Sequence, residues 1–161
     1  MLRTHLSAVL IFSLLTVGAY AQTAGDALKE FGLGIWSEDC GKDSSKTLVR
    51  SMVYTAPTFG RPKVTAGNAS GRNEIEIQTV SRLSEDKLKY VFVYKRMGVG
   101  GVAGERPPPV EPEEMIIQKV GYQIRIFSQR SIDGKTIRIE NGMYKDTSGL
   151  HPEPLWEKCL N

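Results

Sequence analysis

The segment from Asn73 to Lys95 reads NEIEIQTVSRLSEDKLKYVFVYK, and it decides the fold class. From Ile75 to Ser81, apolar or small residues alternate with polar ones, which is the period-two pattern of a half-buried β-strand. From Leu88 to Tyr94, large apolar side chains again occupy every second position. The polar residues Ser84 to Lys87 separate the two runs and are typical of a turn. The segment therefore predicts an antiparallel β-hairpin.

The same alternation continues along most of the chain. A second predicted hairpin joins Met115 to Val120 with Tyr122 to Phe127 across a break at Gly121. Asp133-Gly134 is a strong signal for the next hairpin turn, and Thr136 to Glu140 follows it as another strand. Three weaker runs complete the predicted set: Leu33 to Asp39, Leu48 to Thr55 and Lys63 to Gly67.

These runs predict an all-β fold of about eight antiparallel strands with one short helix before them. The helix is expected at Gly25 to Phe31, with Asp26 as its N-cap and Gly32 at its end. Because open sheet edges are prone to unwanted pairing, we expect a meander that is closed, or nearly closed, into a barrel. A two-sheet β-sandwich is the alternative architecture.

The first 21 residues have the features of a cleaved secretory signal peptide. Arg3 gives a basic start, Leu6 to Val17 form an apolar run, and Ala19-Tyr20-Ala21 is a small-x-small cleavage site. The run is shorter than the about 20 apolar residues that span a bilayer. We therefore expect export, to the periplasm if the source is Gram-negative.

Cleavage after residue 21 would leave residues 22–161 as a single domain of 140 residues with a formal net charge of +2. Basic and acidic residues are interleaved along this chain, which is typical of a solvated surface. Such a distribution does not predict a nucleic-acid partner, which requires basic residues clustered on one face.

The two cysteines, Cys40 and Cys159, both lie beyond the predicted cleavage site. In an oxidising compartment the natural expectation is one disulfide between them, which would tie the first strand to the end of the chain. Two free thiols are the alternative.

No residue pattern predicts a catalytic, cofactor or metal site. The string Gly98-Val99-Gly100-Gly101-Val102-Ala103 fits a dinucleotide-binding pattern, but such a glycine turn must open a helix. The run Pro107-Pro108-Pro109 follows it and cannot continue as a helix. His151 is the single histidine beyond residue 21, and no G-x-S-x-G motif is present, so His151 is assigned a surface role.

Two resemblances concern short motifs. Gly34-Ile35-Trp36 resembles the G-x-W start of the lipocalins and related barrels, which implies a barrel whose floor is closed by Trp36. Trp36 to Cys40, Asp133-Gly134 and Pro154 to Cys159 together resemble a group of small secreted bacterial proteins of unassigned function. That second resemblance implies the same disulfide and fold, and no established activity.

The leading functional hypothesis is a non-catalytic secreted or periplasmic protein that binds a small apolar ligand in the barrel or at its mouth. The residues predicted to line this site are Tyr90, Phe92, Tyr94, Tyr122 and Ile124. The set predicted to point inward consists of Ile75, Ile77, Tyr90, Phe92, Tyr94, Ile124, Ile126, Ile137 and Ile139. These large side chains also allow a filled, purely structural core. A carrier requires an internal cavity of about 300 Å³, the lower end for ligand pockets.

The alternative is an envelope interaction protein or hydrolase inhibitor that binds a protein partner. Its expected contact surface is the Gly- and Pro-rich loop from Gly98 to Pro112. The loop residues assigned to the partner are Gly98, Gly100, Gly101, Arg106 and Pro108. This hypothesis leads if the interior cavity is too small for a carrier.

Overall fold

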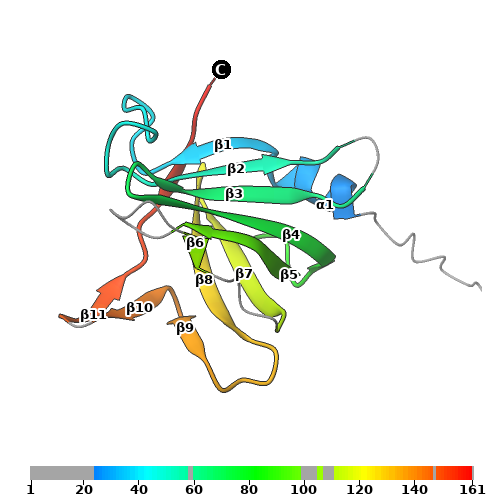
Figure 1. The fold of residues 1–161 in the computed structure, drawn as a ribbon. Helices are drawn as coiled ribbons and strands as arrows, with labels where there is room; N and C mark the ends of the chain where they lie inside the picture. The colour runs from blue at the N-terminus through cyan, green and yellow to red at the C-terminus, as the bar shows by residue number, and fades with distance from the viewer. Residues whose placement is uncertain (1–23, 58–59, 99–104, 107–110, 147, 161) are drawn as a thin grey trace, which may run out of the picture.

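A computed structural model describes residues 24–57, 60–98, 105–106, 111–146 and 148–160 (Figure 1). The predicted signal peptide lies outside these residues. The described part forms one helix and twelve strands: α1 (Ala24–Phe31), β1 (Gly34–Ser37), β2 (Ser51–Thr55), β3 (Lys63–Asn68), β4 (Gly71–Arg82), β5 (Lys87–Gly98), β6 (Glu105–Arg106), β7 (Glu113–Val120), β8 (Gln123–Ser131), β9 (Ile137–Glu140), β10 (Met143–Asp146), β11 (Gly149–Pro152) and β12 (Trp156–Lys158).

Eight of the strands close into an antiparallel barrel. The order around it is β1, β2, β3, β4, β5, β7, β8 and β12, and β12 pairs back to β1. The prediction of an all-β barrel with a short N-terminal helix is thus confirmed, and the sandwich alternative is wrong.

The β4–β5 hairpin forms where the alternating pattern predicted it. Ile75 pairs with Tyr94 and Ile77 with Phe92, so the large apolar residues of both strands meet on the inner face. Ile77 and Phe92 are fully buried. The polar turn between the strands is closed by a hydrogen bond from the Leu83 backbone N–H to the Lys87 carbonyl oxygen, at 3.0 Å.

Helix α1 covers one end of the barrel, which we call the floor (Figure 1). Leu28 and Phe31 are buried there against Trp36, whose indole Nε1 donates to the Gly32 carbonyl oxygen at 2.8 Å. The structural role expected for Trp36 is therefore confirmed. Gly32 ends the helix with φ of +111°, a conformation that favours glycine. The helix begins at Ala24, so Asp26 lies in its first turn rather than at the N-cap.

The strand predicted at Thr136 to Glu140 does not belong to the closed barrel. The start of β8 pairs with β12 (Ile124 with Trp156), but further along β8 pairs with β9 instead (Gln129 with Ile139). A register shift between Gln129 and Arg130 accompanies this change of partner, and the barrel wall divides there. Strand β9 then continues with β10 and β11 as a small meander, which we call the arm (residues 137–152).

This split corrects one inward assignment. Ile139 is buried, but Ile137, two residues earlier on the same strand, is 57% exposed, because β9 leaves the barrel wall there. The eighth strand of the barrel is β12, a three-residue segment that the sequence pattern did not reveal. Figure 1 shows the arm extending on the opposite side of the barrel from α1.

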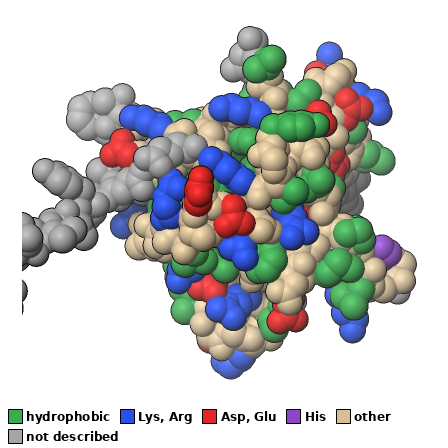
Figure 2. All heavy atoms as spheres, turned by 180° about the vertical axis from the view of Figure 1, so that it is seen from behind, with side chains coloured by type: hydrophobic (Ala, Val, Ile, Leu, Met, Phe, Trp, Pro, Cys, Tyr) green, Lys and Arg blue, Asp and Glu red, His purple; other side chains and the backbone are tan. Residues whose placement is uncertain are grey.

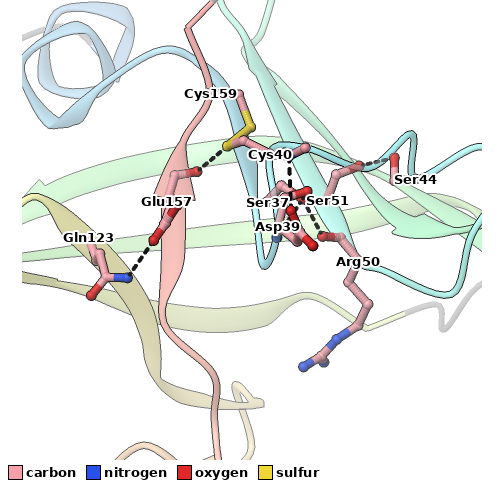
Figure 3. The surroundings of a disulfide bond; sticks show 10 residues. Ser37, Asp39, Cys40, Ser44, Arg50, Ser51, Gln123, Glu157 and Cys159 are labelled. Atoms are coloured by element: carbon pink, nitrogen blue, oxygen red, sulfur yellow. Dashed lines mark hydrogen bonds between the residues drawn. A yellow bond between two sulfur atoms is a disulfide. The ribbon is translucent and has the colours of Figure 1, made fainter.

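Cys40 and Cys159 form the expected disulfide (Figure 3). Each cysteine follows closely on one of two paired strands, β1 and β12, and the Cys159 backbone N–H donates to the Ile35 carbonyl oxygen at 2.9 Å. A structural disulfide of this kind is compatible with an extracellular location. In the described part of the chain, no helix has the length and apolar character needed to cross a membrane.

On the face of the molecule behind that of Figure 1, the charged side chains do not segregate by sign. Figure 2 shows lysine and arginine interspersed with aspartate and glutamate over the face behind that of Figure 1. This agrees with the interleaved charges of the sequence.

Candidate functional site

Buried side chains fill much of the barrel interior, and among the described residues an apolar cavity lies at the end opposite α1. We call this end the mouth. The cavity measures about 180 Å³ and is partly open to solvent. Its lining comes from seven barrel strands and from Arg50, just before β2: Arg50, Met52, Val64, Ala66, Gly67, Asn73, Ile75, Tyr90, Phe92, Tyr94, Met115, Ile126, Gln129 and Trp156.

The size of this mouth pocket bears on both functional hypotheses. At about 180 Å³ it does not reach the about 300 Å³ at which ligand pockets begin. The interior therefore does not support a carrier of a drug-sized apolar ligand, and partner binding becomes the leading hypothesis.

The residues predicted to line a ligand site lie in three different parts of the structure. Tyr90, Phe92 and Tyr94 do line the mouth pocket, with successive rings in edge-to-face contact. Ile124 is buried at the floor, beside Trp36. The assignment of Tyr122 is wrong: this residue lies in the turn between β7 and β8 and is 80% exposed, because the alternating pattern was read one residue too far into the turn.

Two tyrosine hydroxyls meet beneath the pocket. The Tyr54 and Tyr90 hydroxyl oxygens are 3.1 Å apart, and the Tyr90 hydroxyl also donates to the Met115 sulfur at 2.9 Å. Burial raises the pKa of Tyr54 to about 12 and raises the pKa of Tyr90 well above its ordinary value. Both phenols therefore stay protonated at neutral pH, so they act as hydrogen-bonding groups and not as phenolate nucleophiles.

The buried carboxylate of Glu113 stabilises one wall of the pocket through hydrogen bonds. Glu113 is 3% exposed and accepts hydrogen bonds from Arg138 Nε and Nη2, the latter at 2.8 Å. Gln129 Nε2 donates to the same carboxylate at 2.8 Å and to the Tyr94 hydroxyl at 3.0 Å. The network joins β9 of the arm to β7, β8 and β5 of the barrel, and it fixes the amide of Gln129 in the pocket wall.

Arg50 stands at the edge of the pocket, held by two contacts. Its Nε donates to Glu38 Oε1 at 2.7 Å, and its guanidinium carbon lies 5.2 Å from the centre of the Trp156 ring. The second contact is a cation–π interaction. The Arg50 side chain remains 38% exposed.

A larger open groove begins at Arg50 and runs along the arm. This arm groove measures about 380 Å³. It is lined by Arg50, Thr136, Ile137, Arg138, Ile139, Tyr144, Lys145 and Glu153. Because Arg50 lines both spaces, the apolar mouth pocket and the arm groove meet at its side chain.

Glu153 connects the arm to the barrel and is 5% exposed. Its Oε1 makes no hydrogen bond of ordinary geometry with the described residues, although the indole N–H of Trp156 is close enough to lower the pKa of the carboxyl. Burial raises the pKa of the Glu153 carboxyl, an effect that the positive charge of Arg50 opposes. Ionised Glu153 is thus an unfavourable group in the folded state.

Replacing Glu153 with glutamine is expected to stabilise the protein at neutral pH. The folded state binds the Glu153 proton more tightly than the unfolded chain does, so ionisation costs stability above the raised pKa, and the cost disappears as the pH falls through it. Glu153→Gln should therefore unfold at a higher denaturant concentration than wild type at pH 7, with a smaller difference near about pH 4. Glu140→Gln, which removes an exposed carboxylate of the arm, is the control. A stabilisation by Glu153→Gln that did not shrink in acid would contradict this assignment.

The loop that was expected to bind a partner lies largely outside the described residues. Gly98 ends β5, and Arg106 belongs to β6, which pairs with β5. Gly100, Gly101 and Pro108 are among the residues that the structure does not describe. The loop assignment stays a prediction.

His151 lies on the arm in a cluster that resembles a serine-hydrolase triad in composition only. Ser148 Oγ and Asp146 Oδ1 lie 2.9 and 3.1 Å from the same ring nitrogen, Nε2 of His151. A working triad places the serine and the aspartate on opposite ring nitrogens, so that the aspartate orients the base. In the described part of the chain, no group of three or more His, Cys, Asp or Glu residues is placed to hold a metal ion.

No protein-family model, curated protein or solved structure matches this chain. Its function must therefore be inferred from the geometry of the mouth pocket and the arm groove.

Proposed function

We propose that this protein is a non-catalytic, exported binding protein that recognises a segment of a protein partner at the mouth of its barrel. One apolar side chain of the partner enters the mouth pocket, and the neighbouring residues of the segment lie along the arm groove. The observation that carries this proposal is the junction at Arg50 of a small apolar pocket with a longer, open and polar groove.

The dimensions favour a side chain over a free small molecule. A pocket of about 180 Å³ suits a single anchoring residue, and protein interfaces concentrate their binding energy in such desolvated anchors. The arm groove is about twice as large and open along its length, which suits a chain that continues beyond the anchor.

Export rests on two features. The first 21 residues have the pattern of a signal peptide, and the Cys40–Cys159 disulfide is of the kind that persists in oxidising compartments. A binding protein outside the cytoplasm has other envelope or secreted proteins as its available partners.

Blocking the mouth pocket should abolish recognition of the apolar anchor. Ala66 is a small, partly buried residue of the lining, so Ala66→Phe fills the pocket from its wall. A random-peptide phage library selected on wild-type protein should become enriched in peptides with a large apolar residue, and this enrichment should disappear on Ala66→Phe. Thr79→Phe, which adds the same ring at an exposed position of β4, should select like wild type.

Native mass spectrometry of the exported protein is the measurement that can contradict the proposal. A small-molecule adduct that is present on wild type and Thr79→Phe, but absent from Ala66→Phe, would overturn the proposal in favour of a carrier. Absence of anchor enrichment on wild type would also overturn it.

A further inference from the structure

The groups lining the arm groove suggest the chemistry of the segment that lies in it. Three of the lining residues are basic (Arg50, Arg138 and Lys145) and one is acidic (Glu153). The acid is 5% exposed, whereas the two arginine side chains are 38% and 41% exposed, and Lys145 is also exposed. The exposed charged groups that a bound segment meets in this groove are therefore cationic donors.

Each of these cations has donor capacity left. Arg50 uses Nε and Nη2 on Glu38, and Arg138 uses Nε and Nη2 on Glu113. Among the described residues, the Nη1 atom of either arginine has no partner, and Lys145 Nζ has none. A guanidinium held in place on one side by a carboxylate is well ordered to bind a second acceptor on the other.

The carboxylates near these three cations limit the long-range effect of their positive charge. Glu38, Glu113 and Glu153 together balance the three cations, so the groove has little long-range positive field. Selectivity must come from short-range hydrogen bonds to the free donors. A carboxylate is the acceptor that such donors bind best, because both partners are ionised.

We infer that the partner segment is acidic beside its apolar anchor, with carboxylate side chains bound by Arg50, Arg138 and Lys145 in the arm groove. This inference rests on the proposed function and names the chemistry of its partner. An apolar residue fills the mouth pocket, and Asp or Glu residues near it in sequence lie along β9 and β10.

Lys145 offers the cleanest test, because its side chain is exposed and makes no hydrogen bond or ion pair with the described residues. The random-peptide phage library is selected on wild type, on Lys145→Glu and on Lys158→Glu. Lys158→Glu makes the same charge change in β12, at a lysine that lines the floor and not the groove. Peptides from wild type and Lys158→Glu should be enriched in Asp and Glu near the apolar anchor, whereas peptides from Lys145→Glu should keep the anchor and show less acidic enrichment, because Arg50 and Arg138 remain in the groove.

Affinities of one selected acidic peptide give a second measurement. Replacing each of its carboxylates by the corresponding amide should weaken binding to wild type about 2- to 5-fold, the range for an exposed ion pair. On Lys145→Glu, replacing the carboxylate that Lys145 binds should leave the affinity unchanged or improve it, whereas the carboxylates bound by Arg50 and Arg138 should keep their effect. Melting curves of the variants verify that each one is folded.

The outcomes separate this inference from the proposed function. Anchor-bearing peptides with equal acidic content on wild type and Lys145→Glu would overturn the acidic specificity and leave the anchor pocket intact. Wild-type selections without an apolar anchor would overturn both.

Discussion

Removing the Cys40–Cys159 disulfide should lower the free energy of unfolding by about 2–5 kcal/mol. The bond joins residues 119 positions apart, so it restricts a large part of the unfolded chain. In the chain-entropy model a loop of this size contributes about 4–5 kcal/mol, and measured values are commonly lower. For a domain whose total stability is typically about 5–15 kcal/mol, this is a large share.

The disulfide also stabilises the part of the barrel wall with the fewest paired residues, where β12 lies between β1 and β8. Strand β12 has three residues, and its register holds only two residue pairs with β1 and two with β8. Cys159 follows directly on β12, and Cys40 lies three residues beyond the end of β1 (Figure 3). Without the bond, β12 should fray first, and Trp156 would then leave the wall of the mouth pocket.

Denaturant unfolding of Cys40→Ser/Cys159→Ser beside wild type measures the loss. Addition of reductant should destabilise wild type to a similar extent and leave the double variant unchanged. Hydrogen exchange should show the earliest loss of protection at β12 and at the adjoining part of β1. Two free thiols found by non-reducing peptide mapping of the wild-type protein would contradict the basis of this prediction.

The fold class was predictable because it depends on local alternation. The hairpin from Asn73 to Lys95 combines two alternating runs with a polar turn, and the structure has both strands and the turn at that place. The strands are longer than predicted, β4 beginning at Gly71 and β5 ending at Gly98. Their ends are set by pairing with β3 and β6, which no local pattern encodes.

The closing strand β12 was missed because three residues are too short to show a period. Its strand conformation depends on β1 and β8, which are distant in sequence. One signal did point to it: a disulfide between Cys40 and Cys159 brings the residues before Cys159 alongside the first strand. The predicted bond therefore implied this pairing.

The alternation of Ile137 and Ile139 correctly indicated a strand. It also indicated that both side chains point into the barrel, which is wrong for Ile137. A period of two shows which residues share a face, but it does not show whether the strand stays in the barrel wall. The split of β8 between β12 and β9 decides that, and it leaves Ile137 exposed.

The charged residues of the candidate site had no signal in the sequence. Arg50, Arg138 and Glu153 come from the ends of three different segments, and their partners Glu38 and Glu113 are set by tertiary packing. The aromatic part of the site was predictable in part, because Tyr90, Phe92 and Tyr94 share the inner face of one alternating strand.

Replacing Trp36 with alanine should destabilise the protein by about 3–5 kcal/mol, the range for removing a large buried aromatic side chain. Trp36 is 5% exposed and closes the floor between α1 and the barrel. Only about 10 Å³ of free space remains between Trp36, α1 and the interior residues Tyr54, Ile117 and Ile124, so on that side the substitution leaves a cavity in tightly packed surroundings. The Gly32 carbonyl oxygen would also lose the indole N–H that it accepts at 2.8 Å.

Trp36→Phe separates the contribution of the buried ring from that of the indole hydrogen bond. It retains a ring in the floor and loses the hydrogen bond, whose net contribution is about 0.5–1.5 kcal/mol, so its stability should fall between wild type and Trp36→Ala. Because α1 packs directly on the indole, hydrogen exchange in α1 should increase in Trp36→Ala well before the strands at the mouth are affected. Peptide selection on Trp36→Ala, at a temperature where it is folded, should resemble wild type, since the floor lies at the opposite end from the mouth pocket. Equal stability of Trp36→Ala and Trp36→Phe would show that the ring does not hold the floor together.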